Sequence, residues 1–274
     1  MTQQNQIDRE GQDQRLKERM QRIQHKIIIL SGKGGVGKTT VSVNLAYKLA
    51  LDGKKVGILD VDIHGPNIAK MLGLEGQMLQ ASQEGIEPVS VLPNLKAVSI
   101  AMLFKDADQP IIWRGPLKMN AIKQFLSDVV WGDLDYLIID SPPGTGDEPL
   151  SACQLIPDIS GAVVLTTPQD VSILDARKSV QFARSINVPV LGIIENMSGL
   201  VCPHCQKTID LFGRGGGQKA ALDLKVPFLG QLPMDPDIVK QSDSGKPFVA
   251  SNRDHVTNQN MDSIVMKIME GIKS

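Results

Sequence analysis

Ten residues that follow the first apolar run of the chain, SGKGGVGKTT (31–40), have the composition of a phosphate-binding loop. Three of the glycines fit the dinucleotide pattern G-x-G-x-x-G, which also needs an acidic residue about 20 positions later, here Asp60. Gly32 to Thr39 also fit the P-loop pattern G-x-x-x-x-G-K-[ST], in which Lys38 would reach the β- and γ-phosphates and Thr39 would hold Mg²⁺. The residues expected to contact nucleotide here are Gly34, Gly35, Val36, Gly37, Lys38, Thr39 and Thr40.

Two carboxylates occupy positions where phosphate chemistry would use them. Asp140 ends the apolar run YLIID, as the Mg²⁺-binding aspartate of a P-loop enzyme should. Asp62 follows the second apolar run and would either orient the attacking water or cap the strand end. In the next loop, Gly144 would let the backbone approach a γ-phosphate. The dinucleotide interpretation survives only if Lys38 and Asp140 are accidental.

The segment GLVCPHC (199–205) contains two of the three cysteines, Cys202 and Cys205. A Cys-x-x-Cys turn places both thiolates on one side, which suits a thiophilic metal, but two thiols are half of a four-sulfur site. The third, Cys153, lies in an apolar helical stretch and is interpreted as a buried structural thiol. Zinc, with His204 as a substitute ligand, is the rival metal. A redox dithiol is disfavoured because the motif does not begin a helix that would lower a thiol pKa.

Short apolar runs that alternate with helical stretches predict how these groups are positioned. Strands are expected at 26–30, 55–62, 136–140, 161–167, 189–196 and 228–233, and helices at 38–51, 117–130, 172–186 and 216–225. Strand alternating with helix predicts an α/β fold with a doubly wound, mostly parallel sheet. The expected organisation is a charged helical arm over 1–25 and a single P-loop ATPase domain over 26–274 that carries the CPHC loop.

Composition and charge exclude several classes of protein. The chain has 274 residues, with 29 Lys and Arg against 30 Asp and Glu, so no general attraction to nucleic acid or an anionic membrane is expected. No apolar stretch reaches the roughly 18 residues of a membrane span, and the polar N-terminus does not resemble a signal peptide. The sequence predicts a cytoplasmic protein. The C-terminal stretch 261–274 has an apolar face with balanced charges, which favours packing on the domain over lipid binding.

Taken together, these motifs resemble a known family. KGGVGKTT, with its extra lysine, resembles the deviant Walker A loop of the ATPase class that includes the nitrogenase iron protein, MinD and ParA. Within that class, DVDIHGPN, WRGP, DSPPGTGDEPL, TTPQD, ENMSGLVCPHC and FGRGGG resemble the Mrp/ApbC family of iron–sulfur cluster carriers, over about residues 25 to 250. The resemblance implies a homodimer in which Lys33 reaches the partner's nucleotide. It also implies that Thr39 and Asp140 serve Mg²⁺, that Asp62 lies in the first switch, and that the adenine contacts are Asn196 and the stretch from Pro233 to Asp235.

A two-fold dimer would place two copies of the cysteine loop opposite one another. We therefore expect Cys202 and Cys205 of both copies to hold one [4Fe–4S] cluster, which is passed to apo iron–sulfur proteins under the control of slow ATP hydrolysis. Catalytic roles are expected for Lys33, Lys38 and Asp62, and the expected cofactors are ATP, Mg²⁺ and the cluster. The alternatives are a spatial organiser of the MinD or ParA kind and an electron-transfer ATPase similar to the nitrogenase iron protein.

Overall fold

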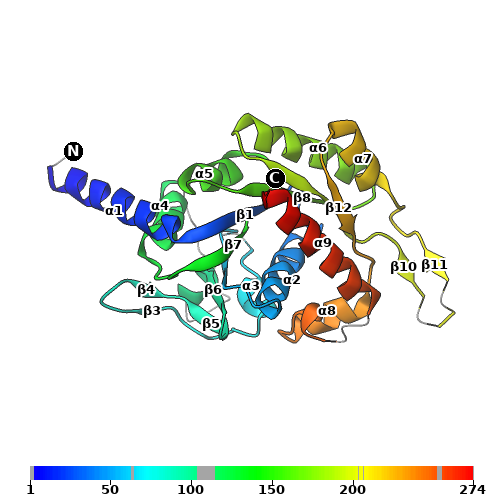
Figure 1. Ribbon diagram of the computed structural model, residues 1–274, viewed down its shortest axis with the longest axis horizontal. Coiled ribbons are helices and arrows are strands. Elements are labelled where there is room, and N and C mark those ends of the chain that lie inside the picture. The colour runs from blue at the N-terminus through cyan, green and yellow to red at the C-terminus, as the bar shows by residue number, and fades with distance from the viewer. Residues whose placement is uncertain are drawn as a thin grey trace.

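An eight-stranded sheet forms the centre of the molecule in the computed structural model, which describes residues 3–62, 65–103, 115–202, 204–205, 207–251 and 255–273 (Figure 1). The strand order is β12-β9-β8-β1-β7-β2-β6-β5, and only β5 pairs antiparallel to its neighbour. The predicted mostly parallel sheet is confirmed. The strands are β1 (Ile23–Ser31), β2 (Val56–Asp60), β5 (Val89–Leu92), β6 (Leu95–Ser99), β7 (Leu134–Asp140), β8 (Gly161–Thr166), β9 (Val190–Glu195) and β12 (Phe228–Gln231).

Helices cover both faces of this sheet, and two short antiparallel strand pairs lie outside it (Figure 1). The helices are α1 (Gln3–Gln21), α2 (Lys38–Leu51), α3 (Ile68–Met71), α4 (Gly115–Asp128), α5 (Asp147–Leu155), α6 (Asp170–Ser185), α7 (Gly216–Leu224), α8 (Pro236–Asp243) and α9 (Val256–Lys273). Two 3₁₀ turns occur at η1 (Ile100–Leu103) and η2 (Phe248–Ala250). The small pairs are β3 (Gln80–Ala81) with β4 (Ile86–Glu87) and β10 (Leu200–Val201) with β11 (Thr208–Ile209).

The continuous apolar run of β1 is explained by burial on both faces of the sheet. Successive strand side chains point to opposite faces, so Ile27 and Ile29 pack in the core formed with α2 and α9. Ile28 and Leu30 pack in the second core, beneath α4, α5, α6 and α7. Every residue from Ile27 to Leu30 is at most 1% exposed, which leaves no position in the run for a polar side chain.

Parallel pairing brings the polar ends of several strands to one edge of the sheet. In the β2–β7 register Asp60 pairs with Asp140, and Ile29 of β1 pairs with Asp140 from the other side. Further along the same edge, Thr166 of β8 pairs with Glu195 of β9. Loops that leave the carboxyl ends of adjacent parallel strands are where ligands bind in open α/β sheets.

Both ends of the described chain pack on this framework. Leu16 and Met20 of α1 are buried, and the buried Lys26 donates from Nζ to the Met20 carbonyl at 3.2 Å, close to the end of that helix. Burial lowers the pKa of Lys26, and Asp158 partly opposes the effect. The apolar face of α9 is buried against the core, as the sequence predicts. Of the helices in the described part of the chain, none combines the length and apolar character required to span a bilayer.

Candidate functional site

The loop between β1 and α2 is built for an anion at the start of a helix. Gly35 and Gly37 have φ angles of 77° and 87°, in the left-handed region that glycine adopts without strain. Gly37 supplies no side chain to cap α2, so the first turn of this 14-residue helix presents its backbone N–H groups toward the loop. A Cβ atom at Gly37 would lie 2.2 Å from Nδ2 of Asn196. A side chain at this position would therefore strain the backbone and displace Asn196.

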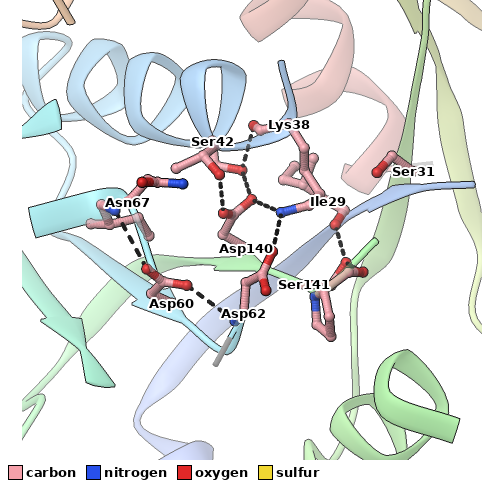
Figure 2. A network of polar contacts seen from close by, with 12 residues as sticks. Ile29, Ser31, Lys38, Ser42, Asp60, Asp62, Asn67, Asp140 and Ser141 are labelled. Atoms are coloured by element: carbon pink, nitrogen blue, oxygen red, sulfur yellow. Dashed lines mark hydrogen bonds and ion pairs between the residues drawn. The ribbon is translucent and has the colours of Figure 1, made fainter. Parts of the chain in front are cut away.

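A buried polar network joins α2 to the ends of β2 and β7 (Figure 2). Lys38 Nζ donates to Asp140 Oδ1 at 2.9 Å and lies 3.8 Å from Asp62 Oδ2. Thr39 Oγ1 donates to Asp140 Oδ2 at 2.7 Å, and Ser42 Oγ donates to Asp140 Oδ1 at 2.7 Å. The sequence-predicted residues Lys38, Thr39, Asp62 and Asp140 therefore meet at one point. Ser42 was not predicted, although its place one helical turn after Lys38 puts it on the same face of α2.

Asp60 lies behind this network and is 1% exposed. It accepts from the backbone N–H of Asp62 at 3.1 Å and from Ser99 Oγ at 3.1 Å. Burial, followed by the nearby negative charge of Asp140, raises the pKa of Asp60 well above the usual range of an aspartate. Asp60 therefore shapes the loop that carries Asp62 and does not face outward toward a ribose, as the dinucleotide interpretation required.

An apolar cavity adjoins the P-loop at Gly37 and Thr40. Its volume is about 240 Å³, and it contains the sequence-predicted residues Asn196, Pro233 and Asp235. Asn196 Nδ2 donates to the carbonyl of Val36 at 2.8 Å, which ties the end of β9 to the P-loop. Residues that the sequence did not reveal, among them Met197, Leu200, Leu232, Ile238 and Phe248, supply most of the wall. A planar, largely apolar group such as a nucleobase suits this cavity.

The carboxylate of Asp235 already has structural partners. Oδ1 accepts from the backbone N–H of Asp237 at 2.9 Å and caps α8. Oδ2 lies 3.3 Å from Thr257 Oγ1 and 3.5 Å from His255 Nδ1. An adenine contact made by this residue would therefore involve its backbone, and the predicted role remains a prediction.

Two further predicted residues flank the P-loop. Gly144 adopts a left-handed φ of 97° and donates its N–H to the carbonyl of Ser31 at 2.7 Å, so the loop after β7 is attached to the end of β1. Lys33 is half-buried, and Ser31 Oγ donates to its carbonyl at 3.1 Å. Within the described residues, the ion pairs do not include the ammonium group of Lys33.

The two cysteines lie beyond the cavity, at the tip of the β10–β11 hairpin, which extends from the end of the molecule opposite α1 (Figure 1). Cys202 is half-buried, Cys205 is exposed, and both are free thiols. Backbone N–H groups of Cys205 and then His204 lower the pKa of Cys202. The argument against a redox dithiol is therefore wrong in one respect, because the turn lowers this thiol pKa without a helix.

Cys153 is separate from this pair, as the sequence predicts. It lies on the buried side of α5, where burial raises its pKa to about 11. Within the described residues, no group of three or more histidine, cysteine, aspartate or glutamate side chains is placed to hold a metal ion. The hairpin therefore presents two thiols without a third ligand from this part of the chain.

Comparison with known proteins agrees with this geometry. The model of the ParA family described as "NUBPL iron-transfer P-loop NTPase" matches residues 22–269. An iron–sulfur cluster carrier protein from Methanocaldococcus jannaschii is 55% identical over 262 residues, covering 96% of this chain and 90% of its own. A nucleotide-binding protein from Archaeoglobus fulgidus, solved in complex with ADP, has a TM-score of 0.78 at 41% identity and covers 88% of this chain and 94% of its own.

A more distant structure shows the fold alone. MinD from Aquifex aeolicus aligns with a TM-score of 0.63 at 22% identity, over 90% of this chain and 97% of its own. The family model spans the P-loop, the acidic network and the cysteine hairpin together, so the match does not rest on the phosphate loop alone. The chain belongs to the NUBPL iron-transfer P-loop NTPase family.

Proposed function

We propose that this protein is an ATP-dependent iron–sulfur cluster carrier. Its cargo would be a [4Fe–4S] cluster held by Cys202 and Cys205 of two copies of the chain and delivered to apo iron–sulfur proteins. The observation that carries the proposal is the pair of accessible thiols on a hairpin that begins directly after the cavity residues Asn196 and Met197. A cluster at such a site would be reachable by an acceptor, and the names of the close relatives support this cargo.

The residues around the P-loop support hydrolysis of ATP. The adenine would occupy the cavity beside Asn196, and the phosphates would lie over the N-terminus of α2. Lys38 would exchange its carboxylate partners for the β- and γ-phosphate oxygens. Asp62, 3.8 Å from the ammonium group of Lys38, would then orient the attacking water. Hydrolysis would be slow, well below about 1 s⁻¹, because a switch must persist until an acceptor arrives.

The donor set at Asp140 fits Mg²⁺. A carboxylate and a hydroxyl 2.7 Å apart, from Asp140 and Thr39, are the hard oxygen groups that this ion prefers. Bound there, Mg²⁺ would neutralise negative charge on the nucleotide phosphates. The chain's own contribution is to hold the two oxygens in register through the hydrogen bond from Ser42 to Asp140.

A homodimer would complete both sites. Two thiols per chain give four ligands in a two-fold pair, the number that a [4Fe–4S] cluster requires. Lys33, on the rim of the P-loop and outside the ion pairs of the described residues, would reach the phosphates of the partner's nucleotide. Nucleotide and cluster would then lie across the same interface, so that one can alter the affinity for the other.

The C-terminal helix argues against a membrane-bound spatial organiser. Met261, Ile264, Val265 and Ile268 of α9 are at most 1% exposed, so the apolar face that could enter a lipid surface is already occupied. This packing supports a carrier over a membrane-bound organiser, and the proposed carrier would be cytoplasmic and would not bind nucleic acid.

Anaerobic reconstitution with iron and sulfide tests the function directly. Iron, sulfide, zinc and protein are quantified on the dimer peak, and transfer to an apo-acceptor is followed by the acceptor's activity. We expect about four irons and four sulfides per dimer, lost in Cys202→Ser/Cys205→Ser and retained in the matched control Cys153→Ser. Zinc alone, or no metal on an unchanged dimer, would refute the carrier proposal.

A further inference from the structure

Glu195, the last residue of β9, is a fully buried carboxylate with no assigned role. Its Oε1 accepts from Ser198 Oγ at 2.6 Å and from the backbone N–H of Gly215 at 2.9 Å. Its Oε2 accepts from the backbone N–H of Gly217 at 2.5 Å. Within the described residues, no lysine or arginine forms an ion pair with Glu195, so backbone amides and one hydroxyl satisfy the buried charge.

These partners lie at the two ends of the cysteine hairpin. Ser198 precedes β10, and Gly215 and Gly217 follow β11 at the start of α7. One carboxylate therefore joins the segment that enters the hairpin to the segment that leaves it. The contact is close-packed, because a Cβ atom at Gly217 would lie 3.0 Å from the Cβ and 3.1 Å from Oε2 of Glu195. The hairpin, by contrast, extends outward with its strand residues Val201 and Ile209 exposed.

The same strand end also contacts the nucleotide site. Asn196, the next residue, donates to the Val36 carbonyl in the P-loop at 2.8 Å. The Leu232 N–H, in the wall of the cavity, donates to the backbone carbonyl of Glu195 at 2.9 Å. Two consecutive residues of one strand therefore hold the P-loop and cavity on one side and both ends of the hairpin on the other.

We propose that Glu195 is the positioning residue that transmits nucleotide binding from the P-loop to the cysteine hairpin. A shift of Val36 and Leu232 around bound nucleotide moves the end of β9, and the carboxylate moves both ends of the hairpin with it. The orientation of the two thiols then follows the state of the nucleotide site. The relevance to cargo rests on the proposed function, whereas the coupling itself is a property of the protein without a cluster.

Glu195→Gln tests this coupling because it preserves shape while removing the charge. The amide can still accept at one oxygen, but its NH₂ group meets the Gly217 N–H donor, so that bond is lost. Hydrogen exchange of the hairpin (199–213) is measured with and without the non-hydrolysable analogue AMP-PNP and Mg²⁺. Exchange of the P-loop and the affinity for AMP-PNP are measured on the same samples, and Glu270→Gln, on the exposed side of α9, is the matched control.

In the wild type and in Glu270→Gln we expect AMP-PNP to change the exchange rate of the hairpin amides by about 5-fold or more, the lower range of allosteric coupling. In Glu195→Gln the hairpin response falls toward 1-fold while P-loop protection and AMP-PNP affinity persist. If Glu195 had a merely structural role, its replacement would lower stability without changing the ratio of hairpin exchange rates with and without AMP-PNP. Ser198→Ala, which removes only one of the three bonds, should give an intermediate ratio, and it carries the test if Glu195→Gln does not fold.

The outcomes separate this inference from the carrier proposal. An unchanged hairpin response in Glu195→Gln, or a wild-type hairpin that ignores AMP-PNP while the P-loop responds, overturns the role of Glu195 and leaves cluster binding intact. A response that depends on Glu195 in a protein that takes up no iron or sulfide supports the coupling and refutes the cargo.

Discussion

Replacing Lys38 should destabilise the folded protein as well as abolish hydrolysis. The ammonium group is the cation beside Asp140 at 2.9 Å and Asp62 at 3.8 Å, with the buried Asp60 behind them. The Lys38 side chain is 7% exposed and that of Asp140 is 1% exposed, so water cannot replace the lost partner. Lys38→Met keeps most of the apolar stem, so its effect reports the charge more than a cavity.

The magnitude follows from the burial of this pair. Removing one partner of a buried ion pair costs about 3–5 kcal/mol, because a charge is left without compensation. For domains of this size class that corresponds to a fall in melting temperature of roughly 6–20 °C. Lys48→Met is the matched control on the same helix. Lys48 pairs with Asp52 and Asp262 near the surface, where an ion pair contributes about 0.2–1 kcal/mol.

The loss of stability in Lys38→Met should also grow as the pH rises. Burial and Asp140 raise the pKa of Asp60 above its unfolded value, and Lys38 opposes this rise. At pH values between the unfolded and the folded pKa of Asp60, the folded state binds the proton more tightly than the unfolded chain does. The free energy of unfolding therefore falls as the pH rises through this range. Without Lys38 the folded pKa of Asp60 rises further, so the pH range over which stability is lost becomes wider. The deficit of Lys38→Met should therefore be smaller at pH 5 than at pH 8.

Urea denaturation followed by far-ultraviolet circular dichroism measures these free energies at both pH values. The double variant Lys38→Met/Asp140→Asn should recover part of the loss, because it removes one of the uncompensated charges. The reasoning is refuted if Lys38→Met is as stable as the wild type at pH 8, or if its deficit is the same at both pH values.

Two further predictions concern single residues. Cys153 should resist iodoacetamide at pH 8 while the two hairpin thiols react, because Cys153 is buried and its pKa is about 11. Peptide mass spectrometry measures the alkylation of each cysteine, and alkylation of Cys153 before unfolding would contradict the prediction. Gly37→Ala should abolish nucleotide binding in isothermal calorimetry, because the left-handed backbone costs about 1–3 kcal/mol and the new Cβ atom would displace Asn196. Gly53→Ala is the control for backbone strain alone, because Gly53 has a φ of 81° and no atom lies within 4 Å of its Cβ position. Equal nucleotide affinity in the two variants would contradict the proposed contact between the new Cβ atom and Asn196.

Much of the framework could be predicted because it depends on local patterns. The buried strands β1, β7, β8 and β9 appear in the sequence as continuous apolar runs, and the P-loop has its own spacing. The meeting of Lys38 with Asp140 also followed, since parallel strands bring their carboxyl ends to one edge. The short strands β5 and β6 were missed because polar residues interrupt their apolar pattern.

The wall of the cavity could not be predicted in the same way. Phe248 lies far along the chain from Gly37, and no local spacing relates them, although both line the same cavity. Glu195 gave one weak signal, a charged residue that ends an apolar strand. Its three hydrogen-bond donors come from after the strand and from the start of α7, and only the tertiary structure brings them together.

Asp140 and Glu195 are buried carboxylates of the sheet edge that accept hydrogen bonds from different kinds of donor. This difference indicates which part of the protein can change. Asp140 accepts from three side chains, Lys38, Thr39 and Ser42, and each of these can rotate toward another partner. Glu195 accepts two of its three bonds from backbone amides, which cannot leave without moving α7. Nucleotide would therefore rearrange side chains around Asp140, whereas the end of β9 would respond as a rigid unit. Asp140 thus makes flexible contacts near the phosphates, and Glu195 makes rigid contacts at the hairpin. This arrangement allows a small local change at the nucleotide to reorient the thiols.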